Sequence, residues 1–130
     1  MASWESLLEY LRADYGAAEN EHGFVTLAYV WEDEDRSQAL IVQTYENNGV
    51  EWLSLQSGVC DESELDYKDA LVKNADIAVG SLILEENQYW LHYGIPLGFI
   101  EDTDTLDALL LYVATMADAL ETEITGGDDH

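Results

Sequence analysis

Cysteine, proline and basic residues are scarce in this chain of 130 residues, and their scarcity limits the kinds of protein that it can be. Cys60 is the one cysteine, so no internal disulfide forms and a reducing compartment is indicated. We expect its thiol to be a small buried apolar side chain rather than a reactive group. The uncharged run of residues 108–117, in an apolar stretch, is half as long as a membrane span requires. Because no cationic leader precedes an apolar stretch, the sequence predicts a cytoplasmic protein.

The charge balance is one-sided. Against 28 acidic residues stand 4 basic ones, Arg12, Arg36, Lys68 and Lys73, which gives a net charge of −24. Such a surface repels phosphate, so binding to nucleic acid or to an anionic membrane is disfavoured. Three explanations of the acidity stay open: adaptation to a salty cytoplasm, a chaperone that keeps apolar partners soluble, and mimicry of nucleic acid. The irregular spacing of the acids favours the third least.

The remaining composition is that of a folded protein. Apolar residues make up 48% of the chain, which is ordinary for a globular domain and argues against disorder. The length is close to the commonest domain size. We therefore expect one α+β domain over residues 1–125, followed by a flexible acidic tail over residues 126–130.

Apolar periodicity predicts three helices. The first follows Ser3 as a candidate N-cap and ends at Gly16. A short middle helix is expected over residues 61–74, with acids in its first turn and lysines toward its end. The last helix, capped by Thr103 or Asp104, is the clearest, and it ends at Gly126-Gly127. Its apolar residues recur at intervals of three and four: Leu106, Leu109, Leu110, Val113, Ala117, Leu120 and Ile124.

Alternating and β-branched segments predict five strands between these helices. They are expected over residues 24–31, 37–46, 50–60, 77–84 and 88–95. An acidic turn over residues 32–35 separates the first two, and Asn47-Asn48-Gly49 is a strong hairpin signal between the next two. The predicted order is α-βββ-α-ββ-α. Short connections favour an antiparallel sheet packed by the N- and C-terminal helices on one face.

The residue types that carry chemistry are not placed together by the sequence. His22, His92 and His130 lie far apart and lack the spacing of zinc helices. The stretch from Asp102 to Asp104 begins like a calcium loop but lacks its later ligands. Cys60 has no histidine nearby in the sequence, and Ser57-Gly58 lacks the first glycine of a nucleophile elbow. We therefore predict a protein that is not an enzyme, with no catalytic, cofactor-binding or metal-binding residues.

Apolar content on both sides of the strands is the unusual feature. An antiparallel sheet with one free face normally alternates cleanly between apolar and polar residues. Here Trp52 and Trp90 alternate with apolar neighbours that point the other way, and Trp31 is a further candidate for the second face. Large aromatic residues on a face that two long helices cannot cover indicate a partner, a second subunit or the short middle helix; ordinary core filling is the alternative.

The order of elements and three segments resemble the type III secretion chaperone-like superfamily, and within it the YbjN-like family more than the dedicated secretion chaperones. The segments are Ala-Leu-Val-Lys-Asn at residues 70–74, the hairpin of residues 82–97 that ends in Ile-Pro-Leu, and the helical stretch of residues 113–121. The resemblance implies a homodimer of α+β protomers that binds extended, partly unfolded polypeptide on apolar patches and sheet edges. It implies no catalytic residues.

The prediction is thus a dimeric, chaperone-like or regulatory module whose partner is another polypeptide. The candidate partner-binding residues come from the first helix and the aromatic strand face: Trp4, Leu8, Tyr29, Trp31, Trp52 and Trp90. The candidate subunit contact is on the middle helix: Leu65, Tyr67 and Leu71. The alternative is a small-molecule-binding protein or small enzyme, with an aromatic pocket between the sheet and the terminal helix lined by Trp90, Tyr93 and Tyr112.

Overall fold

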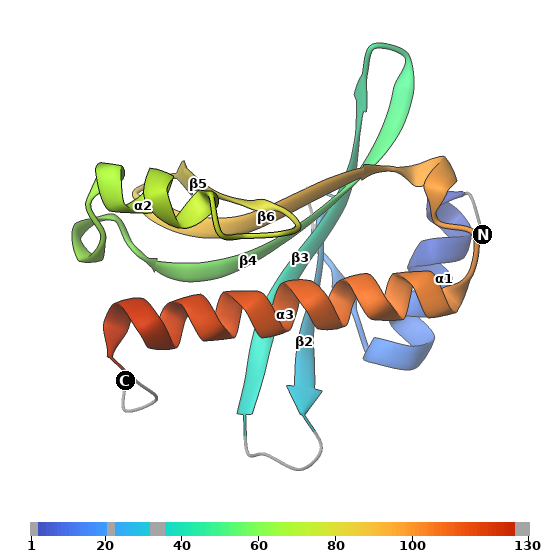
Figure 1. The fold of residues 1–130 in the computed structure, drawn as a ribbon. Helices are drawn as coiled ribbons and strands as arrows, with labels where there is room; N and C mark the ends of the chain where they lie inside the picture. The colour runs from blue at the N-terminus through green and yellow to red at the C-terminus, as the bar shows by residue number, and fades with distance from the viewer. Residues whose placement is uncertain (1–2, 21–22, 32–35, 127–130) are drawn as a thin grey trace.

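The computed structural model describes residues 3–20, 23–31 and 36–126. The acidic turn expected at residues 32–35, His22, His130 and the tail from residue 127 onward lie outside these ranges. The elements, shown in Figure 1, are α1 (Trp4–Tyr15), β1 (Ala18–Glu19), β2 (Val25–Trp31), β3 (Arg36–Asn47), β4 (Val50–Asp61), η1 (Glu62–Glu64), α2 (Tyr67–Asn74), β5 (Ser81–Glu85), β6 (Gln88–Pro96), η2 (Leu97–Phe99) and α3 (Thr103–Thr125).

The strands form a six-stranded antiparallel sheet in the order β1-β2-β3-β4-β6-β5. The long hairpin of β3 and β4 extends beyond the rest of the sheet (Figure 1). It turns at Asn48 and Gly49, which both have positive φ, as the Asn-Gly signal predicts. The predicted α+β class, with an antiparallel sheet and helices at both ends of the chain, is confirmed.

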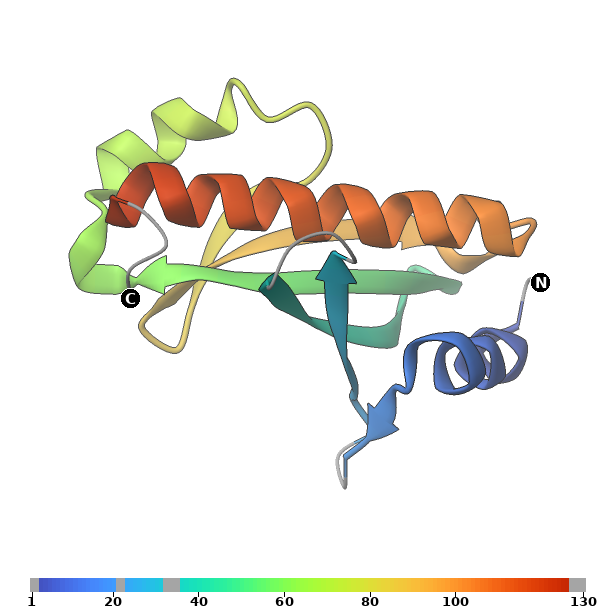
Figure 2. The ribbon, with the colours of Figure 1, turned by 90° about the horizontal axis from the view of Figure 1, so that it is seen from below.

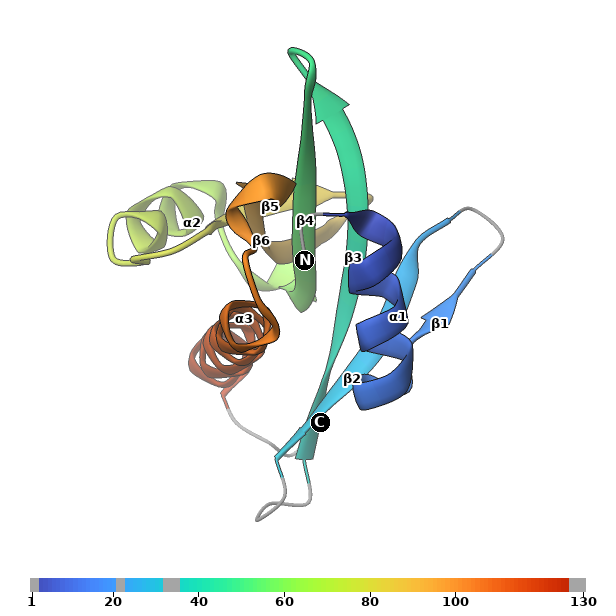
Figure 3. The same ribbon diagram turned by 90° about the vertical axis from the view of Figure 1, so that its right-hand side faces the viewer.

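All three helices pack on one face of the sheet, which is strongly twisted. Views from below and from the side show α2 and α3 next to each other on one face, with α1 at the β1–β2 end (Figures 2 and 3). Side-chain contacts agree. Arg36, on the same side of β3 as Leu40, pairs with Asp118 of α3, and Tyr29, on the matching side of β2, meets the ring of Tyr15 just inside the end of α1. Helix α2 packs on β5 and pairs with α3 through Lys73 and Glu123. We call the helix-covered side the inner face and the opposite side the outer face.

The core lies between α3 and the inner face. Every third or fourth residue of α3 points toward the sheet, so its apolar stripe is removed from water. The fully buried residues of α3 are Leu106, Leu110, Val113, Ala114 and Ala117. They meet strand residues that share the inner face across the ladders and are equally inaccessible: Val25, Leu40, Val42, Leu53, Leu55 and Leu91.

Helix α1 is attached to α3 by two tyrosines and one carboxylate. The Tyr10 hydroxyl donates to both oxygens of Asp107 at 2.7 and 2.9 Å, and the Tyr15 hydroxyl donates to Oδ1 at 2.7 Å. The hydrogen bond to Asp107 is the main cause that raises the pKa of Tyr10 to about 12. Burial, followed by the same hydrogen bond, raises the pKa of Tyr15. Leu7 and Leu11 complete the attachment, since both are fully buried.

Three elements differ from the sequence-based expectation. The two-residue strand β1 was not expected, because two residues are too few to show alternation. Strand β5 begins at Ser81 rather than at residue 77, because Gly80 turns the chain with a φ of +84°. The middle helix divides, since Asp61 and Glu64 close a capping box around the short η1 turn and the extended Leu65 separates it from α2.

The helix ends follow the rules of capping more closely. Ser3 accepts a hydrogen bond from the Ser6 backbone N–H as the predicted N-cap of α1, and Gly16 ends that helix in the left-handed conformation. The N-cap of α3 is Asp102, one residue earlier than the expected Thr103 or Asp104, and its side chain accepts from the Thr105 backbone N–H. Gly126 ends α3, also at positive φ.

Replacing Tyr10 and Tyr15 together by Phe tests the attachment of α1. Hydrogen bonds to charged groups contribute roughly 1.5–3 kcal/mol each, and solvent reduces this at a partly exposed site, so we expect the free energy of unfolding in urea to fall by about 2 kcal/mol. The matched control is Tyr93→Phe, because no hydrogen bond of the Tyr93 hydroxyl is present among the described residues. That change should cost less than about 0.5 kcal/mol.

The same pair predicts a loss of stability in alkali. A tyrosine whose pKa is raised in the fold stabilises it fully below its unfolded pKa, near 10, and this contribution is lost as the pH rises toward 12. The doubly substituted protein should lack this part of the alkaline destabilisation. An unchanged pH dependence between 10 and 12 would show that the tyrosines do not hold α1.

Candidate functional site

The outer face of the sheet carries aromatic residues, and no described helix covers it. Strand registers place Trp52 opposite Tyr45 on one side and Pro96 on the other, and Trp90 opposite Gly58 and Ile83. Trp52, Trp90 and Ile83 are half-buried and Tyr45 is exposed. The apolar side chains lie in two groups, with the polar Ser54 and Gln56 between them. Exposed apolar groups on an uncovered sheet face are candidates for an interaction site.

Tyr45 and Trp52 form the aromatic centre at one end of this face. Their rings stack with centroids 6.4 Å apart and an angle of 14° between the planes. The Tyr45 hydroxyl also crosses β4 and reaches Gly94 of β6, where a Cβ atom would approach that oxygen to 3.0 Å. Gly94 is the partner of Ser54 in the β4–β6 ladder, so the Tyr45 side chain passes over Ser54. Glycine at position 94 therefore leaves the space that this arrangement needs.

Two polar atoms beneath this end of the face have no hydrogen-bond partner among the described residues. They are the Ser54 hydroxyl and the Trp52 indole N–H, both inaccessible to solvent. Ser54 is 1% exposed although it lies on the face without helices. A buried polar group that lacks a partner costs roughly 1–3 kcal/mol, so each of these two atoms calls for a physical explanation.

Next to these residues the sheet divides. Strands β3 and β4 pair from Ile41 and Gln56 toward the hairpin turn, whereas residues 36–40 of β3 and 57–61 of β4 do not pair with each other. We call this division the fork. Side chains replace the missing ladder: the Gln38 amide donates to Ser57 Oγ and to the Gly58 carbonyl, each at 2.9 Å. The Ser57 hydroxyl donates to the Ala39 carbonyl at 2.6 Å.

The fork holds an open cavity of about 520 Å³. Its walls are Thr26, Ala39, Ile41, Gly58, Trp90 and Gln88, together with Gln38, Leu40, Val59, Cys60, Asp61 and Glu121. Cys60 is buried, and desolvation with the neighbouring carboxylates raises the pKa of its thiol to about 11. The thiol is therefore protonated at neutral pH, which leaves it a weak nucleophile. The cavity combines apolar side chains with amides and carboxylates.

The four basic residues of the protein all lie in the helix layer or on the inner face. Arg12 belongs to α1 and pairs with Glu19. Arg36 extends from β3 to Asp118 of α3, and its guanidinium lies 5.8 Å from the Trp31 ring centroid. Lys68 and Lys73 belong to α2, and Lys73 pairs with Glu123 of α3. The outer face therefore holds no lysine or arginine to oppose the surrounding negative charge.

His92 is the one titratable imidazole on the described outer strands. It lies opposite Gln56 and Ser81 in the ladders and is half-buried. Burial lowers its pKa below the ordinary value near 6.5, although the charge of Glu85 acts in the opposite direction. The ring is therefore neutral at pH 7 and adds no cation to this surface. Its neutral form both donates and accepts hydrogen bonds.

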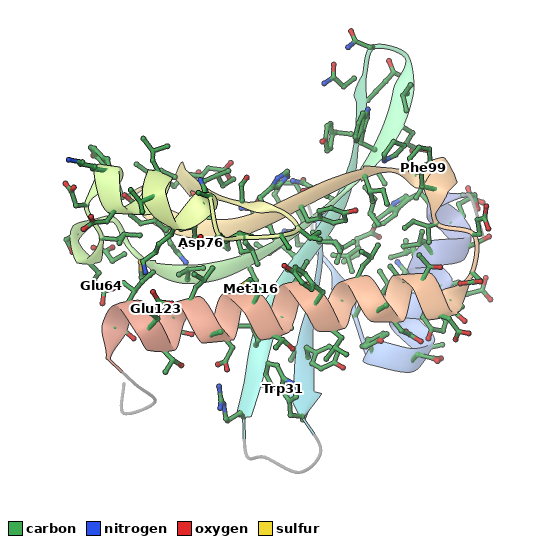
Figure 4. All side chains as sticks on the ribbon, viewed as in Figure 1. Trp31, Glu64, Asp76, Phe99, Met116 and Glu123 are labelled. Carbon is green, nitrogen blue, oxygen red and sulfur yellow. The ribbon has the colours of Figure 1, made fainter. Side chains whose placement is uncertain are left out.

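The predicted aromatic strand face is divided between the two sides of the sheet. Trp52 and Trp90 lie on the outer face, as their alternation predicts. Tyr29 and Trp31 lie on the inner face and pack against the core, so the expectation that the four share one surface was wrong. The ring centroids of Tyr29 and Tyr15 lie 6.3 Å apart. Those of Trp31, labelled in Figure 4, and Tyr29 lie 5.4 Å apart. These rings join α1 to β2.

The candidate contact residues on and beside the helices differ in how far they are exposed. Trp4 and Leu8 are partly buried and pack against the core, which limits the surface that they offer. Leu65 is only 9% exposed and its carbonyl accepts a hydrogen bond from the Tyr89 hydroxyl at 3.0 Å, so it offers little surface for contact with a second subunit. Tyr67 and Leu71 are exposed, Leu71 by 72%. They lie one turn apart on α2 and remain candidates for that contact.

Trp90, Tyr93 and Tyr112 do not line one common pocket between the sheet and the terminal helix. The inward residues of α3 are fully buried against the strands. Trp90 and Tyr112 line separate cavities, the first at the fork and the second, of about 570 Å³, beside Val79 and Leu109, whereas Tyr93 packs against the core. Within the described ranges, no three His, Cys, Asp or Glu residues are grouped to hold a metal ion. No described helix is long and apolar enough to cross a membrane.

The sequence did not indicate Tyr45, Ser54 or the fork as parts of a site. Tyr45 appears in the sequence only as one residue of a β-branched and aromatic strand. The alternation in residues 50–56 does place Ser54 on the same side as Trp52, which is a usable signal. The fork has a weaker one, since Gln38, Ser57 and Gly58 are polar or small residues inside otherwise apolar strands.

No protein-family model matches the chain, and no curated protein is similar to it at a significant level.

Replacing Gln38 and Ser54 separately tests the buried polar groups. Gln38→Met keeps the side-chain volume but leaves the Gly58 carbonyl without its donor, so we expect the free energy of unfolding to fall by about 2 kcal/mol. Ser54→Ala removes a hydroxyl that has no partner, so stability should stay equal or rise by up to about 1 kcal/mol. Urea denaturation measures both. An equal loss in the two variants would show that the Ser54 hydroxyl is satisfied in solution.

Proposed function

We propose that this protein is a non-catalytic, cytoplasmic module that binds another polypeptide and acts as a chaperone-like or regulatory protein. The observation that carries the proposal is the outer face, on which Trp52, Trp90 and Tyr45 stay accessible while all three helices pack on the other side. Aromatic residues in the centre of an apolar patch are the usual anchors of protein interfaces, because they remove a large apolar area from water at a small cost in side-chain entropy.

The open edges of the sheet support the same function. Strand β5 is the last of the sheet, and β1 pairs with only two residues of β2. Among the described residues, the edge of β2 from Leu27 to Trp31 therefore has no strand partner on the β1 side. An extended polypeptide can add to such an edge through backbone hydrogen bonds. The resemblance to type III secretion chaperone-like proteins of the YbjN-like family agrees with this mode of binding.

The proposal includes a homodimer that forms through α2. Tyr67 and Leu71 lie on one face of this helix, and the adjacent Val72 is also exposed. Lys68 is exposed on the same short helix, so α2 is one of the few regions where an acidic protein offers a cation. Within its own bounds α2 carries two lysines against one acid, Asp69, so two protomers of charge −24 repel each other less through this helix than through a wholly acidic surface.

Peptide binding to the outer face is the direct test. The probe is a panel of fluorescein-labelled, extended nonapeptides rich in β-branched residues, with negative, zero and positive net charge, measured by fluorescence anisotropy. We expect micromolar binding of at least one charge class. Trp52→Ser and Trp90→Ser should each weaken it about tenfold, because an aromatic anchor contributes about 1–2 kcal/mol or more. The control is Leu111→Ser, which changes an exposed apolar residue of α3.

Binding that is lost equally in the Leu111 control, or absent with every peptide of the panel, would contradict the proposed function. Circular dichroism of each variant shows whether the fold is kept.

The dimer is tested through Leu71. Analytical ultracentrifugation should show a dimer whose affinity rises with salt, because screening weakens the repulsion between the two acidic protomers. Leu71→Asp adds a charge to the apolar contact and should shift the protein to a monomer with little change in its own stability. Leu111→Asp is the matched control on α3. A wild-type monomer at all salt concentrations would exclude the dimer while leaving peptide binding to be judged separately.

A further inference from the structure

The partner of the outer face is specified by charge and aromatic geometry together. We propose that this face binds an extended polypeptide segment carrying two arginine or lysine side chains, one seated at Trp52 and the other at Trp90. The proposal rests on the proposed function and names the chemical class of its partner. Four observations carry it: the placement of the bases, the acids around the face, the indole rings and the distance between them.

The placement of the bases leaves the outer face without positive charge on a protein of net charge −24. All four lysines and arginines of the chain lie on α1, on α2 or on the inner side of β3. The outer strands therefore hold no cation that a positively charged partner would meet, and His92 is neutral because burial lowers its pKa. A cationic segment meets an unopposed attraction here, whereas an acidic one is repelled.

Acids lie at the Trp90 end of the face, where one end of such a segment would bind. Glu85 shares the outer side of β5 with Ile83, and its backbone carbonyl accepts the Trp90 indole N–H at 3.3 Å. Asp61 and Glu121 line the fork cavity together with Trp90. Negative charge is thus placed around the Trp90 indole. Glu46 and Glu51 are exposed and follow Tyr45 and Trp52 in the β3–β4 ladder, but they point to the other side of the sheet, so Trp52 is the seat that depends on its ring alone.

Indole rings bind cations directly. A guanidinium or ammonium group over an aromatic face is attracted by the ring quadrupole, most strongly by tryptophan. The protein already makes this contact on its inner face, where the Arg36 guanidinium lies 5.8 Å from the Trp31 ring centroid. Trp52 and Trp90 are half-buried on the opposite face without an internal cation, so the same contact is open to a partner.

The positions of the two indoles set the spacing of the partner's cations. Trp90 lies opposite Gly58 in the ladder, and Gly58 follows Trp52 by six residues along β4. Six residues of a strand span about 20 Å. An extended segment that runs along β4 therefore presents residues i and i+6 to the two rings, and both point to the same side because the separation is even. Between them it crosses Ser54 and Gln56.

The test uses an extended nonapeptide with arginines six residues apart and a fluorescein label. The matched peptide has citrulline at both positions, which keeps the shape and hydrogen-bonding groups of arginine but removes the charge. A third peptide has the arginines five residues apart, so that they point to opposite sides. We expect the citrulline peptide to bind at least about tenfold more weakly and the third peptide to bind with intermediate affinity.

Two variants assign the effect to the rings. Trp52→Leu and Trp90→Leu keep an apolar side chain but remove the aromatic face, so each should reduce the preference for arginine over citrulline about threefold or more while changing the citrulline affinity little. Leu111→Ala on α3 is the control and should leave the preference unchanged. Circular dichroism and the urea midpoint show that each variant is folded.

Each result has a distinct meaning. Equal affinity for the arginine and citrulline peptides would overturn the cationic partner but leave polypeptide binding in place. A preference for arginine that survives both tryptophan variants would show a diffuse attraction to the acidic surface and would overturn the assigned seats. Failure of all peptides, including the uncharged and acidic ones of the panel above, would reject the proposed function itself.

Discussion

The structure depends on the burial of α3 against a single face of the sheet. The apolar stripe of this helix meets strand residues from β2, β3, β4 and β6, so one helix organises most of the core. Helix α1 joins it through the two tyrosines that donate to Asp107, and α2 joins it through Lys73 and Glu123. Because all the helices are used on this side, the aromatic residues of the other face have no internal cover.

The same arrangement distributes charge unequally. Few cations are present, and the two best-defined ion pairs to α3, from Arg36 and Lys73, hold the helix layer together. Partly exposed ion pairs of this kind add little to stability. Their greater consequence is that the cations are held on the helix side of the sheet. The outer face is left without a lysine or arginine, and the described strand acids that share it, Glu85 and Asp61, lie at the Trp90 end.

The fork and the covered Ser54 hydroxyl show that the outer side of β4 is not an ordinary solvated strand. In a regular sheet the ladder between β3 and β4 would continue to the ends of both strands. Here Gln38 and Ser57 replace it, and buried polar groups lie within a few residues of the exposed indoles. A surface that joins unsatisfied polar groups, aromatic rings and a cavity is better suited to recognition than to stability, because stability alone would favour a continuous, fully bonded sheet.

The sequence by itself determined the helices at both ends, the hairpin at Asn48 and Gly49, and the sharing of one side of β4 by Trp52 and Ser54. These features are local, because capping, turn geometry and two-residue alternation each depend on a few neighbouring residues. Only the tertiary structure decided that Tyr29 and Trp31 face the helices while Trp90 faces away from them, that Tyr45 crosses to Gly94, and that β3 and β4 separate at the fork. Those outcomes depend on the register between strands distant in the chain, and alternation within one strand does not fix which of its two sides the helices will cover.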